Sequence, residues 1–166
     1  TFDYFTEAIV GKAKAIRTDY QPTEDDNVTI KGVAGDTYAM GFLGYAYYEE
    51  NKDKVKAVAI DHGKGCVLPS RETVLDGTYQ PLSRPLFIYV NVKSLDRPEV
   101  QAFVDFYLSP AARRAIRSTG YVELPSEAYR IGQELVKRRK AGTFFMELPA
   151  GTPLSKFIQE LDKELR

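Results

Sequence analysis

The sequence predicts an α/β fold. Apolar runs with strand character alternate with segments of helical spacing in the first half of the chain, and the second half is mostly helical in its spacing. Hydrophobic residues make up 43% of the 166 residues and aromatic residues 12%, which is enough to fill a core. The length is typical of one globular domain or of a piece of a larger protein.

The composition disfavours several classes of function. Lys and Arg number 23, and Asp and Glu also number 23, so a basic nucleic-acid module is not expected. No apolar run approaches the roughly 18 residues that a membrane-spanning helix needs. Cys66 is the single cysteine, which excludes an intrachain disulfide and any metal site with several cysteines. His62 is the single histidine, which excludes any site that needs two histidines. We therefore expect no metal, no cofactor and no nucleic-acid partner.

The first expected helix begins at Thr1 and ends near Gly11. Thr1 is a good N-cap residue, and Asp3 and Glu7 place acidic groups in the first turns, where they interact favourably with the helix dipole. The apolar residues of this helix share one face at helical spacing: Phe2, Phe5, Ile9 and Val10. The chain opens without an initiator methionine or an apolar leader, which is typical of a processed or partial product.

The next segments alternate between helix and strand. Residues 23–36 fit either a short helix that Asp25 or Asp26 caps, or a strand, because Val28 and Ile30 also alternate with polar residues. Three elements are expected after it: a buried strand at Tyr38–Tyr45, a helix at Ala46–Lys54 and a half-buried strand at Val55–Ile60.

A turn and a short helix precede the strongest strand signal of the chain. Two glycines give Asp61–Gly65 the backbone freedom of a turn. Ser70 precedes a short helix that Gly77 stops. Arg84–Val92 is almost continuously apolar, which predicts a strand buried on both faces, as in a mainly parallel sheet.

Four helices are expected in the second half. Their apolar stripes, in chain order, are Val100, Phe103, Val104, Tyr107 and Leu108; Ala112, Ala115 and Ile116; Tyr129, Leu135 and Val136; and Leu154, Phe157, Ile158, Leu161 and Leu165. Ser109–Pro110 and Pro125–Ser126 begin the second and third of these helices. The third ends in the basic run Lys137–Lys140, before Gly142.

Most side chains that suggest chemistry have a simpler explanation. His62 lies in a turn without a second histidine or a nucleophile motif, so a solvated turn residue is expected. Cys66 lacks a CxxC partner and a nearby basic cluster, so a buried or neutral thiol is expected. The carboxylate pairs Asp25–Asp26 and Glu49–Glu50 fit solvated helix ends. No acid–base or nucleophilic arrangement stands out, and we do not expect an enzyme.

The glycine pairs and the basic run also fit structural roles. The chain has three closely spaced glycine pairs: Gly32 and Gly35, Gly41 and Gly44, and Gly63 and Gly65. None of them completes the motif of a nucleotide-binding loop, so we expect close packing and turns at these positions. The charges of Lys137–Lys140 would suit nucleic acid or lipid headgroups, but at the end of a helix they complement the dipole, which is the interpretation that we favour.

Thr1 is the candidate binding residue. A hydroxyl at the start of an amphipathic helix is presented together with the unpaired amides of the first turn, and such a group of donors holds an anion without a formal positive charge. On this pattern alone a plain N-cap is the simpler explanation.

Three stretches and the opening residues are similar to one known family. Gly32–Asn51 resembles the segment after the family's ligand-binding helix, Tyr79–Val90 its return strand into the hinge, and Phe103–Ser109 with Gly120–Pro125 its C-terminal helices. Thr1–Phe5 resembles the residues at the end of the family's Ser-Gly-Thr phosphate loop and just after it, with Thr1 as the last residue of that loop. The family is that of the phosphate-binding proteins of the ABC-type phosphate uptake system.

The resemblance implies a two-lobed protein with a periplasmic binding protein type II fold. Such a protein closes on inorganic phosphate and delivers it to an ABC transporter permease, at the periplasmic or extracytoplasmic face of the membrane. In the family, hydroxyl and amide donors of the loop hold the anion, an Arg before the loop adds charge, and the other lobe supplies hydroxyls and an Asp that accepts the proton of hydrogen phosphate. Only Thr1 has a counterpart in this chain; Arg84 receives no ligand role, and residues 142–166 have no match.

The resemblance also implies a division of the chain. Residues 1–87 would form the larger part of the second ligand-binding lobe, 88–92 the return strand of the hinge, and 93–166 a C-terminal helical segment that packs on the first lobe. Because that lobe lies outside these residues, the apolar faces of the helical segment need another cover, either a second copy of the chain or a partner chain with the first lobe. The alternatives are a lobe for another oxyanion such as sulfate or molybdate, an α/β enzyme with a loop-built site, and an adaptor that binds through Lys137–Lys140.

Overall fold

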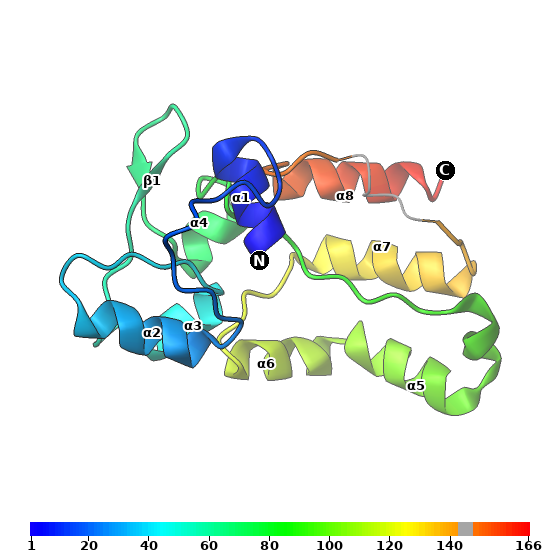
Figure 1. Cartoon of the computed structure of the whole chain (residues 1–166). Coiled ribbons are helices and arrows are strands. Elements are labelled where there is room, and N and C mark those ends of the chain that lie inside the picture. The colour runs from blue at the N-terminus through cyan, green and yellow to red at the C-terminus, as the bar shows by residue number, and fades with distance from the viewer. Residues whose placement is uncertain (143–147) are drawn as a thin grey trace. The chain divides into compact units, whose positions relative to one another are not determined.

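Helices dominate the computed structural model, which describes residues 1–142 and 148–166 (Figure 1). The chain divides into unit 1, Thr1–Leu82, and unit 2, Ser83–Arg166. The elements of unit 1 are α1 (Phe2–Val10), α2 (Asp26–Gly35), α3 (Tyr45–Glu50), β1 (Ile60–Asp61), β2 (Cys66–Val67) and α4 (Arg71–Leu75). Those of unit 2 are the 3-10 helix η1 (Val92–Asp96), α5 (Pro98–Tyr107), α6 (Pro110–Ser118), α7 (Ser126–Lys137) and α8 (Leu154–Lys163).

Sequence signals mark a boundary of α1, α2 and α4, whereas α3 spans Tyr45–Glu50 and is shorter than the helix predicted at Ala46–Lys54. α1 ends at Gly11, which adopts a left-handed conformation with φ 80°. The carboxylate of Asp25 accepts a hydrogen bond from the Asn27 amide at 2.9 Å and caps α2, so the stretch 23–36, which fitted either a helix or a strand, contains the helix Asp26–Gly35. Ser70 and Thr73 form a capping box at the start of α4.

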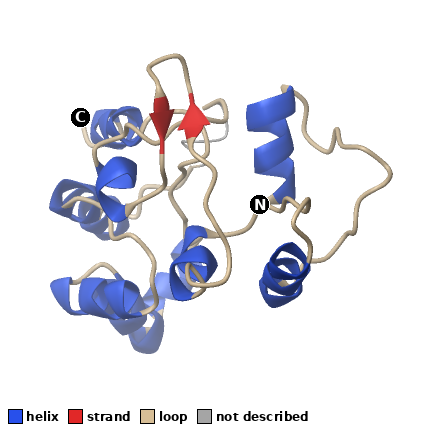
Figure 2. Ribbon diagram, turned by 90° about the vertical axis from the view of Figure 1, so that its left-hand side faces the viewer, coloured by secondary structure: helices blue, strands red, loops and turns tan. Residues whose placement is uncertain are grey.

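The strands β1 and β2 form a short antiparallel hairpin, drawn in red in Figure 2. Ile60 pairs with Val67, and Asp61 pairs with Cys66. In the turn between them, Oδ1 of Asp61 accepts hydrogen bonds from the amides of Gly63 at 2.8 Å and Gly65 at 3.0 Å. Both glycines have positive φ, 86° and 100°, so the predicted turn at Asp61–Gly65 is confirmed.

Three predicted strands are wrong. Tyr38–Tyr45 and Arg84–Val92 form no ladder in residues 1–142 and 148–166, and of Val55–Ile60 only the last residue enters β1. These segments are also exposed in places, since Tyr38 is 96% and Tyr89 81% accessible. The physical reason is that a strand bonds its backbone groups to a neighbouring strand, whereas a helix bonds them within its own segment. Apolar composition predicted the strands, but the described residues contain no partner for them.

The four helices predicted for the second half are confirmed as α5, α6, α7 and α8. Pro110 starts α6, and Oγ of Ser109 accepts a hydrogen bond from the Ala112 amide at 3.3 Å. The turn η1 before α5 was not expected from the sequence. α7 and α8 contact each other and run side by side in Figure 1.

The core of unit 2 lies between these helices. Ile131 of α7 is 0% exposed and Val104 of α5 is 1% exposed. The α5 stripe was expected to need a cover from outside the chain, and for Val104 this expectation is wrong because Val104 is already buried in this chain. Phe103 and Phe106 of the same helix are 60% and 54% exposed.

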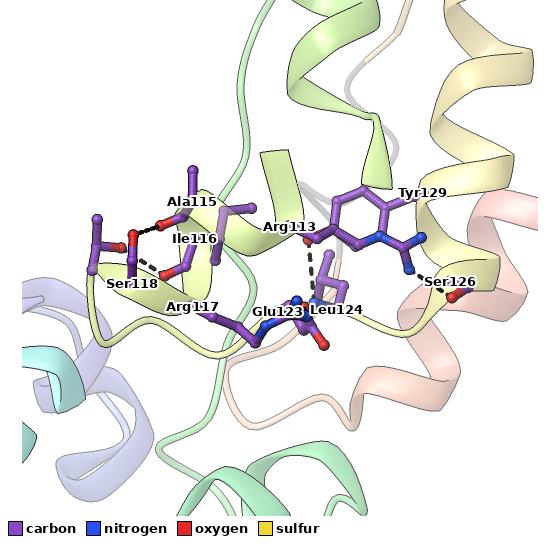
Figure 3. Close-up of polar contacts among 10 residues, drawn as sticks. Arg113, Ala115, Ile116, Arg117, Ser118, Glu123, Leu124, Ser126 and Tyr129 are labelled. Atoms are coloured by element: carbon purple, nitrogen blue, oxygen red, sulfur yellow. Dashed lines mark hydrogen bonds and ion pairs between the residues drawn. The ribbon is translucent and has the colours of Figure 1, made fainter. Parts of the chain in front are cut away.

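The connection between α6 and α7 is fastened by polar contacts, which Figure 3 shows. The guanidinium of Arg113 lies 5.2 Å from the ring centre of Tyr129 and donates to Oγ of Ser126 at 2.6 Å. Arg117 forms an ion pair with Glu123 across the same connection. Burial raises the pKa of the Tyr129 hydroxyl.

None of the helices in residues 1–142 and 148–166 has the length and apolar composition to cross a bilayer.

Candidate anion-binding site

The N-terminus of α1 presents the predicted binding residue. Thr1 is the N-cap of α1 and is exposed. Its carbonyl accepts the Phe5 amide at 2.9 Å, but within the described residues its hydroxyl makes no capping hydrogen bond. The amides of the first turn have no intrahelical acceptor in any α-helix. The hydroxyl and these amides therefore form a group of donors at the positive end of the helix dipole.

Aromatic packing fixes the start of α1 in unit 1. The rings of Phe5 and Phe42 stack with centroids 4.0 Å apart and an interplanar angle of 8°. The hydroxyl of Tyr4 donates to the carbonyl of Pro81 at 2.8 Å. The predicted apolar face is only partly the packed face, because Ile9 at the far end of the helix is 49% exposed. The first two turns, which carry the donors, are the anchored ones.

One acidic group lies at this helix start. Asp3 is in the first turn, and Oδ2 of Asp3 is 3.9 Å from Nζ of Lys14. In α2, burial and the Asp25 charge raise the pKa of Asp26, and the amino group of Thr1 lowers it. From the sequence, Asp26 was assigned to a solvated helix end.

The other side chains considered for chemistry in the sequence were expected to have structural roles. His62 is exposed in the hairpin turn, as predicted. Cys66 is exposed at the start of β2, so of the predicted buried or neutral thiol the buried alternative is wrong. Hydrogen bonds from Lys52 and Tyr45 lower the pKa of Glu49, and burial and the hydrogen bond to Glu49 raise the pKa of Tyr45 to about 12.

The basic run Lys137–Lys140 at the end of α7 forms ion pairs with carboxylates of unit 2. Nη1 of Arg139 lies 2.7 Å from Asp96, and Nζ of Lys140 lies 3.2 Å from Glu164. Arg138 pairs with Glu134 one turn earlier in α7, at 3.8 Å. These ion pairs account for the run as a structural feature of unit 2, beyond the dipole interaction expected from the sequence.

An anchored helix start that offers hydroxyl and amide donors is able to hold a small anion. Comparison with known proteins adds independent evidence. None of the protein-family models matches the chain. Protein SphX of Synechocystis is 50% identical over 162 residues, which are 94% of this chain and 48% of that protein. The phosphate-binding protein PstS of Staphylococcus haemolyticus is 38% identical over 132 residues, 78% of this chain and 40% of that protein.

A solved structure supports the same relationship. The crystal structure of a protein from Planctomyces limnophilus, described as a possible phosphate binding protein, is 43% identical, with a TM-score of 0.66 over 85% of this chain and 50% of that chain. The chain spans about half the length of the curated relatives it matches. The chain is therefore similar to proteins named as phosphate-binding over about half of their length, and its fold is that of part of a periplasmic binding protein, as the resemblance implied.

Proposed function

We propose that the chain carries part of a binding site for inorganic phosphate, with Thr1 as its binding residue. The whole protein would bind phosphate at the periplasmic or extracytoplasmic face of the membrane and pass it to an ABC transporter permease, without catalysing a reaction. The observation that carries the proposal is the exposed Thr1 at the anchored start of α1, in a relative of phosphate-binding proteins.

The chemistry of this helix start suits an oxyanion. The Thr1 hydroxyl and the first-turn amides donate hydrogen bonds, and the helix dipole favours negative charge at the same point. Uncharged donors do not choose between phosphate and sulfate. An acceptor in the other lobe would make that choice, because hydrogen phosphate donates its proton to a carboxylate, whereas sulfate leaves that buried group without a partner.

The division of the chain inferred from the resemblance remains part of the proposal. Residues 1–87 would belong to the second lobe, 88–92 to the hinge and 93–166 to a helical segment that packs on the first lobe. Exposed apolar residues in the hinge and on both sides of it support this division: Leu86, Phe87, Ile88, Tyr89, Phe103 and Phe106. In the whole protein the first lobe would cover them, and the chain by itself would associate with a second copy.

Amide chemical shifts in a phosphate titration test the site. We expect the amide signals of Phe2, Asp3 and Tyr4 to shift. The dissociation constant should be roughly millimolar, because one lobe supplies only part of the donors and has no second lobe to close over the anion. Thr1→Val keeps the side-chain shape and removes the hydroxyl, so it should weaken the binding. Thr18→Val, at another exposed threonine of unit 1, is the matched control and should leave it unchanged.

Three results would contradict the proposal. The first is a phosphate titration that leaves the first-turn amides unshifted. The second is binding that Thr1→Val does not weaken. The third is micromolar or tighter binding by this chain, because that affinity would mean that the described residues already form a complete site. Parallel titrations with sulfate and molybdate show whether these donors prefer another oxyanion.

A further inference from the structure

The loop after α1 folds back onto the first turn of the same helix. Gly11 ends α1 in a left-handed conformation, and Lys14 also has a positive φ of 66°, which is uncommon for a residue with a side chain. Two such residues within four positions reverse the chain. The reversal returns Lys14 to the start of the helix, where its ammonium lies 3.9 Å from the carboxylate of Asp3.

A buried hydroxyl forms a hydrogen bond with this reversal. Thr6, in the middle of α1, is 1% exposed. Its Oγ1 accepts the Lys14 amide at 2.7 Å and donates to the carbonyls of Phe2 at 3.0 Å and Asp3 at 3.1 Å. The hydroxyl therefore uses both its donor and its acceptor capacity, on the loop and on the first turn of α1. Without it, the Lys14 amide would lose its partner.

The position of Lys14 matters because Asp3 places a negative charge at the start of α1. Asp3 lies in the first turn, beside the proposed donors, so its carboxylate repels an incoming anion. Lys14 offsets that charge. The ion pair is exposed, at 73% for Lys14 and 59% for Asp3, so its effect on a bound anion is modest and is screened by salt.

We infer that Thr6 is a positioning residue of the anion site at α1: it holds the loop so that Lys14 lies beside Asp3 and offsets the repulsion of the anion by that carboxylate. The inference rests on the proposed function. Thr6 does not touch the anion and acts through Lys14.

The test combines hydrogen exchange with the phosphate titration on the same chain. Thr6→Val should speed exchange of the Lys14 amide by about tenfold or more, because a hydrogen bond to a buried acceptor is lost, and Thr6→Ser should restore slow exchange. Lys14→Gln should weaken phosphate binding by about two- to fivefold at low ionic strength and by less in about 0.5 M salt. Lys12→Gln, in the same loop, is the matched control for charge.

The double variant separates positioning from general damage to the fold. If Thr6 acts through Lys14, Thr6→Val alone weakens phosphate binding about as much as Lys14→Gln, and adding Lys14→Gln to it has little further effect. Fully additive effects, or a Thr6→Val variant with wild-type affinity, overturn the inference. If the wild-type chain shows no phosphate shifts, the proposed function fails. The exchange rates of Thr6→Val and Thr6→Ser then still decide whether Thr6 holds the loop.

Discussion

Unit 1 and unit 2 are almost equal in length but are held together in different ways. Unit 2 buries apolar side chains of packed helices: Leu95, Val104, Ala112, Ala128, Tyr129, Ile131 and Leu135. Unit 1 buries Ile30 and Ala46, together with polar residues such as Thr6 and Gln80. The helices of this sequence can build a core by packing on one another, whereas the segments predicted as strands contribute little to a core without partner strands.

The two units also differ in charge. Unit 1 contains 9 Lys and Arg residues against 13 Asp and Glu residues, and unit 2 contains 14 against 10. The proposed anion site thus lies in the acidic unit, where the general field opposes an anion. Binding there has to come from local dipoles and hydrogen-bond donors, which act at short range.

The largest expected effect is on the core of unit 2. Ile131→Ala should lower the free energy of unfolding by about 2–5 kcal/mol, because it leaves a cavity at a fully buried position. Ile30→Ala in unit 1 is the matched change at a 4% exposed position and should cost less, because the smaller core around it can relax. Chemical denaturation measures both. Equal losses would contradict the view that unit 2 is the better packed.

A middle-sized effect is expected on association. If the exposed face of α5 joins two copies, Phe103→Ser should weaken dimerisation by about ten- to a hundredfold, the value of burying one large apolar side chain. Tyr38→Ser, at a 96% exposed residue of unit 1, is the control and should have little effect. Sedimentation velocity at micromolar concentration gives the answer, and a compact wild-type monomer would count against association.

The smallest effect is expected at the end of α7. Arg139→Gln removes the ion pair with Asp96 and should destabilise unit 2 by about 0.2–1 kcal/mol at low salt, because the pair is largely exposed. The loss should shrink as salt rises. Thermal melts of this variant and of Arg114→Gln, at an exposed arginine of α6, compare the two positions. A loss that does not change with salt would assign Arg139 a packing role instead.

Local signals in the sequence predicted the helices well. Asp25, Ser70 and Ser109 cap the helices that begin after them, and Gly11 ends the first. These signals act within one turn of chain, so the sequence contains them completely. The run Arg84–Val92 shows the opposite case, because its structure depends on a neighbour that the apolar pattern cannot identify.

The candidate site was predictable only in part. Thr1 could be found from its place before an amphipathic helix and from the family resemblance. The link from Thr6 through Lys14 to Asp3 was not visible, because it depends on a loop that reverses the chain.

The end of α7 shows how misleading a tally of charges can be. Four consecutive cations would attract the attention of any search for polyanion-binding segments, yet three of them pair with carboxylates of unit 2, one on α7 itself and two on other segments. Their electric field is therefore largely cancelled at short distance, and what the segment contributes is attachment, since it joins α7 to the turn before α5 and to the C-terminal helix. A search for interaction partners of such a chain should therefore start from its surface electrostatic potential and not from its sequence composition.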